Sequence, residues 1–192
     1  MNEDIRAAET AIDVVKEFKQ LSAEYGFTDV GFFDPRKMSF SAEFRQCCED
    51  NLCGQYGANY SCPPYCGTVE EMRAKTLPFT HGALLKTECE VDDAMDETAT
   101  KPIKKDHSMR SKMLIRELKK RGFDRPYLAM LAGCCSICDK CLMPSGKPCP
   151  FPDERTSCLS AYCLNVAELA DTAGMSLSWD IGQVSFFSVF LW

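Results

Sequence analysis

The residues with the clearest capacity for chemistry in this 192-residue chain are its thirteen cysteines. Eight of them form two groups whose spacing allows several thiolates to reach one metal centre. Thiolates are soft ligands that bind iron–sulfur clusters and zinc, so metal binding is the first chemistry that the sequence predicts. The first group is Cys48, Cys53, Cys62 and Cys66, and the second group is Cys135, Cys138, Cys141 and Cys149.

The second group has the more regular spacing. Cys135, Cys138 and Cys141 follow one another at intervals of three residues, as in the C-x-x-C-x-x-C run of bacterial ferredoxins. Those proteins have a fourth cysteine followed by proline, and Cys149-Pro150 provides this pair here after a longer interval. The spacing predicts a [4Fe–4S] cluster at the second group.

The first group offers three firm ligands, Cys48, Cys53 and Cys62, and predicts a second [4Fe–4S] cluster. Cys66 is the candidate for the fourth ligand, beyond a Pro-Pro-Tyr segment. If Cys66 binds, the site is closed and suited to electron transfer. If it does not, one iron is open to a substrate, water or a partner's ligand, and the protein could be an enzyme or activator.

Zinc is the main alternative to iron. Four-cysteine zinc sites typically pair two C-x-x-C steps across a spacer, whereas the steps in this chain overlap within one triplet at residues 135–141. This difference favours iron–sulfur clusters, with redox-active thiols as a third interpretation. A disulfide framework is disfavoured because the number of cysteines is odd and the chain is expected in a reducing compartment.

The other cysteines are interpreted without a metal. Neighbouring side chains of an extended segment point to opposite sides, so only one cysteine of each adjacent pair is expected to bind. Cys135 fits the triplet, which leaves Cys134 as a small buried residue or a spare thiol. Cys158 and Cys163 lie on an expected helix, about 140° apart around its axis, and should not chelate as a pair. Three more residues are expected in surface or packing roles: Cys89, His81 and His107.

The two cysteine groups together resemble a family of predicted metal-binding proteins common in anaerobic bacteria and archaea. The shared positions read C-x4-C-x2-Y-G-x4-C-P-P and C-x-x-C-x-x-C followed by P-C-x-x-P: Cys48, Cys53, Tyr56, Gly57, Cys62, Pro63, Pro64, Cys135, Cys138, Cys141, Pro148, Cys149 and Pro152. The resemblance implies metal binding at the seven shared cysteines and no particular reaction. The tract at residues 158–166 is similar to the family's Ser-x-Glu-Ala-x-Gly-x-x-Val, with Cys158 at the serine and Cys163 at the glycine.

The pattern of apolar residues and turn signals predicts an α+β fold in a single domain, residues 1–192. It has a mixed sheet of about five strands with flanking helices and two cysteine-rich metal loops. Residues 36–65 are expected to form the first loop, and residues 91–106 an exposed linker. Helices are expected over 5–25, 68–76, 107–121 and 153–173, and strands over 28–33, 83–87, 127–131, 176–179 and 184–191.

Charge and hydropathy restrict the partners and the location. A net charge of −6 with two histidines gives no basic surface for nucleic acid. No secretory signal is recognisable, and no stretch approaches the roughly 18 apolar residues of a membrane span. We expect a cytoplasmic protein, and its many oxidisable thiols favour an anaerobic host.

These observations predict an iron–sulfur redox protein that carries low-potential electrons to or within an anaerobic enzyme system. Its partner would be a redox protein or an anaerobic enzyme complex. Two alternatives remain open: an enzyme or activator that uses an open-site cluster, and a structural zinc or cluster-carrier module. The sequence has no P-loop and no dinucleotide fingerprint, so nucleotide chemistry has no support.

Overall fold

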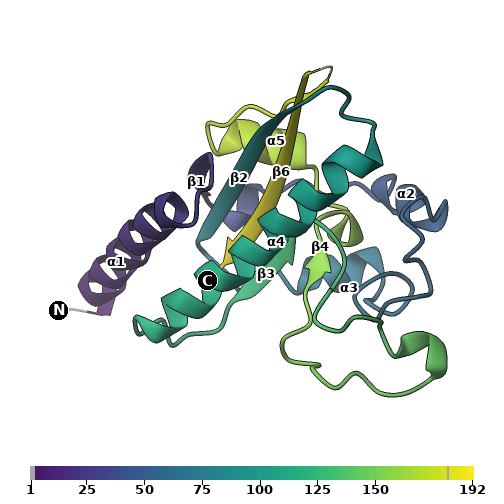
Figure 1. Ribbon diagram of the computed structural model, residues 1–192. Coiled ribbons are helices and arrows are strands. Elements are labelled where there is room, and N and C mark those ends of the chain that lie inside the picture. Colours follow the sequence, from purple (N-terminus) through teal and green to yellow (C-terminus); the bar gives the residue numbers. More distant parts are fainter. Residues whose placement is uncertain (1–2, 181) are drawn as a thin grey trace.

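The computed structural model describes residues 3–180 and 182–192 of the chain (Figure 1). Among these residues, no helix is both long and apolar enough to cross a membrane. In chain order the elements are α1 (Glu3–Glu24), β1 (Asp29–Phe33), η1 (Pro35–Lys37), α2 (Phe44–Glu49), α3 (Val69–Ala74), β2 (Gly82–Val91), α4 (Glu97–Lys120), β3 (Leu128–Leu131), η2 (Met143–Ser145), β4 (Ser157–Cys158), η3 (Ser160–Tyr162), α5 (Val166–Thr172), β5 (Trp179–Asp180) and β6 (Gly182–Leu191), where η denotes a 3-10 turn.

The strands of the described residues form one mixed sheet in the order β1-β2-β6-β3-β4, and β5 pairs with β6 beside this path. β2 and β6 are antiparallel along their whole length, with Gly82 opposite Leu191 at one end. β4 lies at the edge and pairs in parallel with β3, with Cys158 opposite Leu131. The fold is therefore α+β, and the predicted mixed sheet of about five strands is confirmed.

Helices cover both faces of this sheet because consecutive strand residues point to opposite faces. Phe190 of β6 is buried on the face that α1 and α4 cover, in one cluster with Phe18 and Leu114. Its neighbour Leu191 is buried on the other face, in a cluster that includes Met72 of α3 and residues of α5. Figure 1 shows α4 in front of the sheet and α5 behind it.

A polar contact also joins α4 to the sheet. The imidazole of His107 is fully buried and forms hydrogen bonds with Thr87 of β2 at 2.7 Å and Ser188 of β6 at 2.8 Å. Burial, together with the charge of Arg110, lowers the pKa of His107 to about 3, so the ring is neutral. His81 is exposed and stacks on Trp192, so both histidines have the packing or surface roles that the sequence predicts.

The sequence identifies most of the elements correctly. The helices expected over 5–25 and 107–121 correspond to α1 and the C-terminal part of α4. Thr68 and Glu71 form a capping box at the start of α3, where a short capped helix is expected. The strands expected over 28–33, 83–87, 127–131 and 184–191 are present as β1, β2, β3 and β6.

The linker expected over residues 91–106 is wrong from Glu97 onward, where α4 begins. Asp96 is the N-cap, and its carboxylate accepts a hydrogen bond of 2.8 Å from a backbone amide of the first turn. The buried face of this helix includes polar residues such as Thr100 and His107, so its N-terminal half has no apolar periodicity to detect. The irregular connection is limited to the few residues between β2 and α4.

The helix expected over residues 153–173 is wrong in its first half. β4 and the turn η3 occupy that part, and α5 alone is helical. The backbone N–H of Leu159 donates to the carbonyl of Leu131 at 3.2 Å, which ties the segment to β3. Cys163 ends η3 with a positive φ of 57°. Cys158 and Cys163 therefore do not share a helix, and the angular reason for separating them does not apply.

Two further expectations change in detail. The loop expected over 36–65 contains the short helix α2, which carries Cys47 and Cys48. The strand expected over 176–179 is reduced to β5, which starts at Trp179. Neither difference changes the sheet. The helix α2, however, fixes the orientation of Cys48, the first of the candidate ligands.

Candidate metal centres in two cysteine-rich loops

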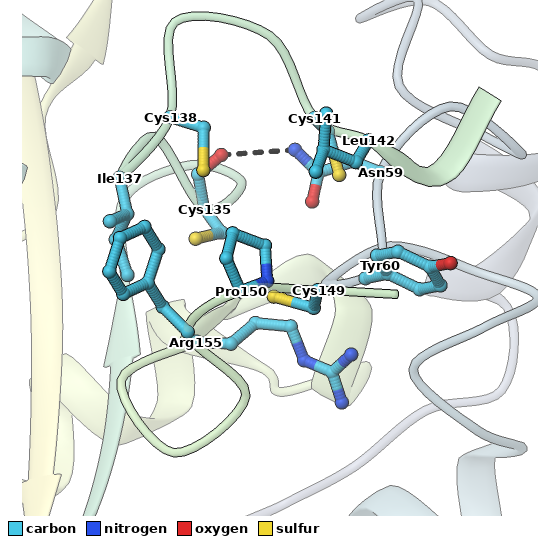
Figure 2. Close-up of a pocket in the computed structure, with 11 residues that line it drawn as sticks. Asn59, Tyr60, Cys135, Ile137, Cys138, Cys141, Leu142, Cys149, Pro150 and Arg155 are labelled. Carbon is cyan, nitrogen blue, oxygen red and sulfur yellow. Dashed lines mark hydrogen bonds between the residues drawn. The ribbon is translucent and has the colours of Figure 1, made fainter. Parts of the chain in front are cut away.

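The thiols of the second group line one pocket (Figure 2). This pocket has a volume of about 360 Å³, which includes space open to solvent. Asn59 and Tyr60, from the first cysteine-rich loop, also line it. The structure thus brings together the cysteines that the sequence grouped. Figure 2 shows their sulfur atoms around a common space: Cys135, Cys138, Cys141 and Cys149.

The second loop (residues 134–149) follows a strand and has a tight turn near its end. β3 ends at Leu131, three residues before the loop begins. Met143, in the turn η2, is buried and anchors the middle of the loop. Gly146 then ends η2 in the left-handed conformation, with φ of 69°, which glycine adopts without steric cost. This turn sends the chain back toward Cys149.

Hydrogen bonds join the second loop to the first loop (residues 48–66). The side-chain amide of Asn59 donates to the carbonyl of Cys135 at 3.0 Å, the contact drawn in Figure 2. The backbone N–H of Cys135 donates to Ser61 Oγ at 2.8 Å. The hydroxyl of Tyr60 donates to the carbonyl of Lys147 at 2.9 Å. The two cysteine-rich loops therefore meet on one side of the molecule.

The four thiols of the second group also interact electrostatically. Burial raises the pKa of Cys138, and the charges of Cys135, Cys149 and Cys141 raise it further. A thiolate at Cys138 is therefore disfavoured by the neighbouring thiols, and a bound cation would relieve that repulsion.

The thiols of the first group differ in their exposure. Cys62 is buried, Cys48 at the end of α2 is partly buried, and Cys53 is exposed. The turn that carries Cys53 is held by the side chain of Asn51, which accepts a hydrogen bond of 2.9 Å from the backbone N–H of Tyr56. The first site therefore spans from the interior of the protein to its surface.

Cys158, which the sequence does not predict to be a ligand, lies beside the first group. Burial raises the pKa of Cys158 to about 11, although the backbone N–H of Ala161, 3.3 Å from its Sγ, acts in the opposite direction. Burial and the charge of Cys158 raise the pKa of Cys48 to about 12. The pKa of Cys62 is raised by its hydrogen bond with Cys134, by burial and by the charge of Cys158. The sequence marks Cys158 in one way: it stands where the family usually has serine.

The thiol of Cys66 has different neighbours. It is buried and belongs to the apolar cluster on the α5 face of the sheet. The Nη1 of Arg45 donates to Cys66 Sγ at 3.8 Å, and the Nη2 of Arg45 donates to the carbonyls of Ala161 at 3.0 Å and Gly67 at 3.4 Å. The guanidinium thereby holds α2, the end of the first loop and η3 together.

The adjacent pair Cys134–Cys135 is divided between the two loops. Cys135 lines the second pocket, whereas the thiol of Cys134 lies beside Cys62 of the first group. The interaction with Cys62 lowers the pKa of Cys134, and the charges of Lys104 and Lys112 act in the same direction. Cys134 is therefore a partly buried thiol at the junction of the two sites.

Cys89 has the packing role that the sequence predicts. It is partly buried and packs against the cluster of Val184 and Phe186 on β6. Cys163, at the end of η3, is fully buried. Cys47, the neighbour of Cys48 on α2, is exposed. None of these three placements changes the grouping of the other thiols.

The donor set fits an iron–sulfur cluster or zinc by its chemistry, since thiolates are the ligands that both prefer. The amide of Ala161, which donates to Cys158 Sγ, is the kind of second contact that orients and tunes a sulfur ligand. The four thiols of the second group line one pocket, but within residues 3–180 and 182–192 no three or more Cys, His, Asp or Glu side chains form a group that could hold a metal ion as they are placed.

Residues 31–192 match the family described as predicted metal-binding protein (DUF2284), and the match includes both cysteine-rich loops. No curated protein and no solved structure matches the chain. The family match covers well over half of the chain, and the resemblance carried by the two cysteine groups is thereby confirmed. The chain belongs to the DUF2284 family of predicted metal-binding proteins.

Proposed function

We propose that this protein binds two [4Fe–4S] clusters, one at each cysteine-rich loop, and carries low-potential electrons to or within an anaerobic enzyme system in the cytoplasm. Membership of a family of predicted metal-binding proteins supports the metal. The observation that carries the proposal is the convergence of four thiols on one pocket in the second loop. Clusters with four cysteine ligands commonly serve in electron transfer.

The proposed ligands come from both loops. Cys66, the fourth ligand expected from the sequence, and Cys158 compete for the last position of the first cluster. The ligands of the second cluster would be Cys135, Cys138, Cys141 and Cys149, and three ligands of the first would be Cys48, Cys53 and Cys62.

The proposed cysteine ligands would hold each [4Fe–4S] cluster, which would supply one-electron transfer chemistry with no covalent bond made or broken in the protein. The chain would hold the two clusters rigidly and close to each other. The contacts of Asn59 and Ser61 with Cys135 hold the two loops together, and the guanidinium of Arg155 lies over the ring of Tyr60 at 5.8 Å. Two sites fixed in this way favour electron exchange between them.

The partner in this proposal is a redox protein or an anaerobic enzyme complex. The net charge of −6 favours docking on a basic surface of that partner. Such long-range attraction weakens at high ionic strength, because salt screens exposed charges over about 8–10 Å. Electron delivery to the partner should therefore slow as salt is added.

An open-site enzyme remains the second candidate because the thiol of Cys53 is exposed. A small ligand could reach an iron beside it if that iron lacked a fourth protein ligand. In that case, added thiols or small anions would shift the spectrum of the wild-type protein. A closed, electron-carrying site predicts no shift.

A redox titration of anaerobically purified protein tests the proposal. We expect the visible absorbance to bleach reversibly, with about one electron per cluster and midpoint potentials of the order of −400 mV. Bound metal that cannot be reduced reversibly would contradict electron transfer and support a structural module instead. The same sample, titrated in the presence of added thiol, distinguishes the open-site enzyme.

A further inference from the structure

We propose that Cys158, and not Cys66, is the fourth ligand of the first site, together with Cys48, Cys53 and Cys62. This inference rests on the proposed function, since it assigns a ligand to one of the two proposed clusters. It also concerns a residue of this chain that departs from the family pattern, where serine is usual. Four independent features of the structure support it.

The first feature is the rigid position of Cys158. It lies in β4, directly opposite Leu131 of β3 in a parallel pairing. The next residue, Leu159, donates its backbone N–H to the carbonyl of Leu131 at 3.2 Å. Metal sites on strands are more precise than sites on loops, because the strand fixes the ligand before the metal arrives. Cys158 is thus a preorganised ligand at the edge of the sheet.

The second feature is a hydrogen bond to its sulfur. The backbone N–H of Ala161 donates to Cys158 Sγ at 3.3 Å. A donor to sulfur stabilises the thiolate, which is the form that binds metal. Contacts of this kind orient metal ligands and tune the potential of the centre.

The third feature is the packing of the first loop against this segment. α2 lies beside η3, and Arg45 of α2 donates to the carbonyl of Ala161 at 3.0 Å. Cys48 is three residues after Arg45 on the same helix, so it is carried toward Cys158. Cys62 lies near the end of β3, because the hydroxyl of its neighbour Ser61 accepts a hydrogen bond of 2.8 Å from the backbone N–H of Cys135, and β3 is the strand that pairs with Cys158.

The fourth feature is a difference between Cys158 and the competing Cys66 in what faces the sulfur. Cys66 Sγ donates to the carbonyl oxygen of Gly67 at 3.8 Å, whereas Cys158 Sγ accepts from the backbone N–H of Ala161 at 3.3 Å. A carbonyl oxygen beside a sulfur repels the negative charge of a metal-bound thiolate, and an amide N–H stabilises it. The backbone around Cys158 therefore suits a metal ligand better than the backbone around Cys66.

Serine substitution of each competing cysteine tests the assignment, with total iron, acid-labile sulfide and electron paramagnetic resonance as readouts. The wild-type protein should contain about eight irons. We expect Cys158→Ser to retain about four irons, those of the second cluster, or to show the signal of a three-iron cluster in addition. The matched variants Cys66→Ser and Cys134→Ser should keep about eight irons and the wild-type spectrum.

Retention of the wild-type iron content and spectrum by Cys158→Ser overturns the assignment, whatever the other variants show. If that variant is insoluble, Cys158→Asp replaces it, because an oxygen ligand should keep the iron but shift the spectrum. An unshifted spectrum in Cys158→Asp also overturns the assignment. Failure of the proposed function looks different: the wild-type protein itself would contain zinc or no sulfide, and the zinc content of the same variants would then identify the ligand.

Discussion

The backbone N–H of Cys135 donates a hydrogen bond of 2.8 Å to the hydroxyl oxygen of Ser61, and this contact joins the two cysteine-rich loops. The hydroxyl of Ser61 in turn donates to Oδ1 of Asn59 at 2.9 Å, and the amide of Asn59 donates back to the carbonyl of Cys135 at 3.0 Å. Ser61 is fully buried, so water cannot replace it in this network. The two proposed sites are therefore connected by the hydrogen bonds among Cys135, Ser61 and Asn59.

Ser61→Ala should weaken both loops at once. The substitution leaves the N–H of Cys135 without its acceptor, at a cost of about 1–3 kcal/mol in the free energy of unfolding, while Oδ1 of Asn59 keeps the hydrogen bond from the backbone N–H of residue 61. Anaerobic denaturant titration measures this loss, and metal analysis should show a lower metal content. The exposed Ser160→Ala is the control and should change stability by less than about 0.5 kcal/mol. Equal stability of the two variants would contradict the coupling.

His107 should make the protein less stable in acid. Its pKa is about 3 in the folded protein and about 6.5 in the unfolded chain, so between these values the unfolded state binds the additional proton. Stability should therefore fall as the pH is lowered through this range, by about 1.4 kcal/mol per pH unit from this group. Denaturant titrations between pH 7 and pH 4 measure the slope.

His107→Gln isolates this effect, because an amide can still form hydrogen bonds with Thr87 and Ser188 but does not titrate. The variant should show a shallower pH dependence than the wild type, while protonation of metal ligands contributes equally to both. Parallel curves for wild type and His107→Gln would show that the buried imidazole does not control acid stability.

Arg45→Lys should destabilise the junction of α2 with the first loop. The guanidinium of Arg45 reaches Cys66 Sγ and the carbonyls of Gly67 and Ala161, and a single ammonium cannot reproduce this fork. We expect a loss of about 1.5–3 kcal/mol, the usual contribution of hydrogen bonds to a charged group. Arg36→Lys, at a surface ion pair, is the matched control and should leave the free energy of unfolding nearly unchanged.

Cys138→Ser should remove the metal of the second site. Loss of a ligand also removes folding free energy that the metal supplies, so the yield of soluble protein should fall. The iron content should drop from about eight to about four per chain. Cys89→Ser, in a partly buried packing position, should keep the full iron content. Undiminished iron in Cys138→Ser would remove this residue from the ligand set.

The sequence predicts that the thiols of the second group lie together, and they line one pocket, because the signal is local. Cys135, Cys138 and Cys141 are close in the chain, so their spacing alone indicates that they converge. The expected helices and strands with clear apolar periodicity are also present, including α1 and β6. The N-terminal half of α4 is missed because polar residues such as Thr100 occupy its buried face.

The surroundings of the first site could not be predicted in the same way. Cys158 follows Cys62 by 96 residues in the chain. The pairing of β3 with β4 brings Cys158 close to the first group. That pairing is between short strands without a clear alternating pattern, and the segment resembles a helix in sequence. The division of Cys134 and Cys135 between two sites likewise depends on how the loops meet.

Metal and sulfide analysis of protein purified without oxygen tests the central claim most directly. Two [4Fe–4S] clusters predict a brown protein with about eight irons and about eight acid-labile sulfides per chain. About one or two zinc ions per chain with no acid-labile sulfide would contradict the claim and support a zinc module.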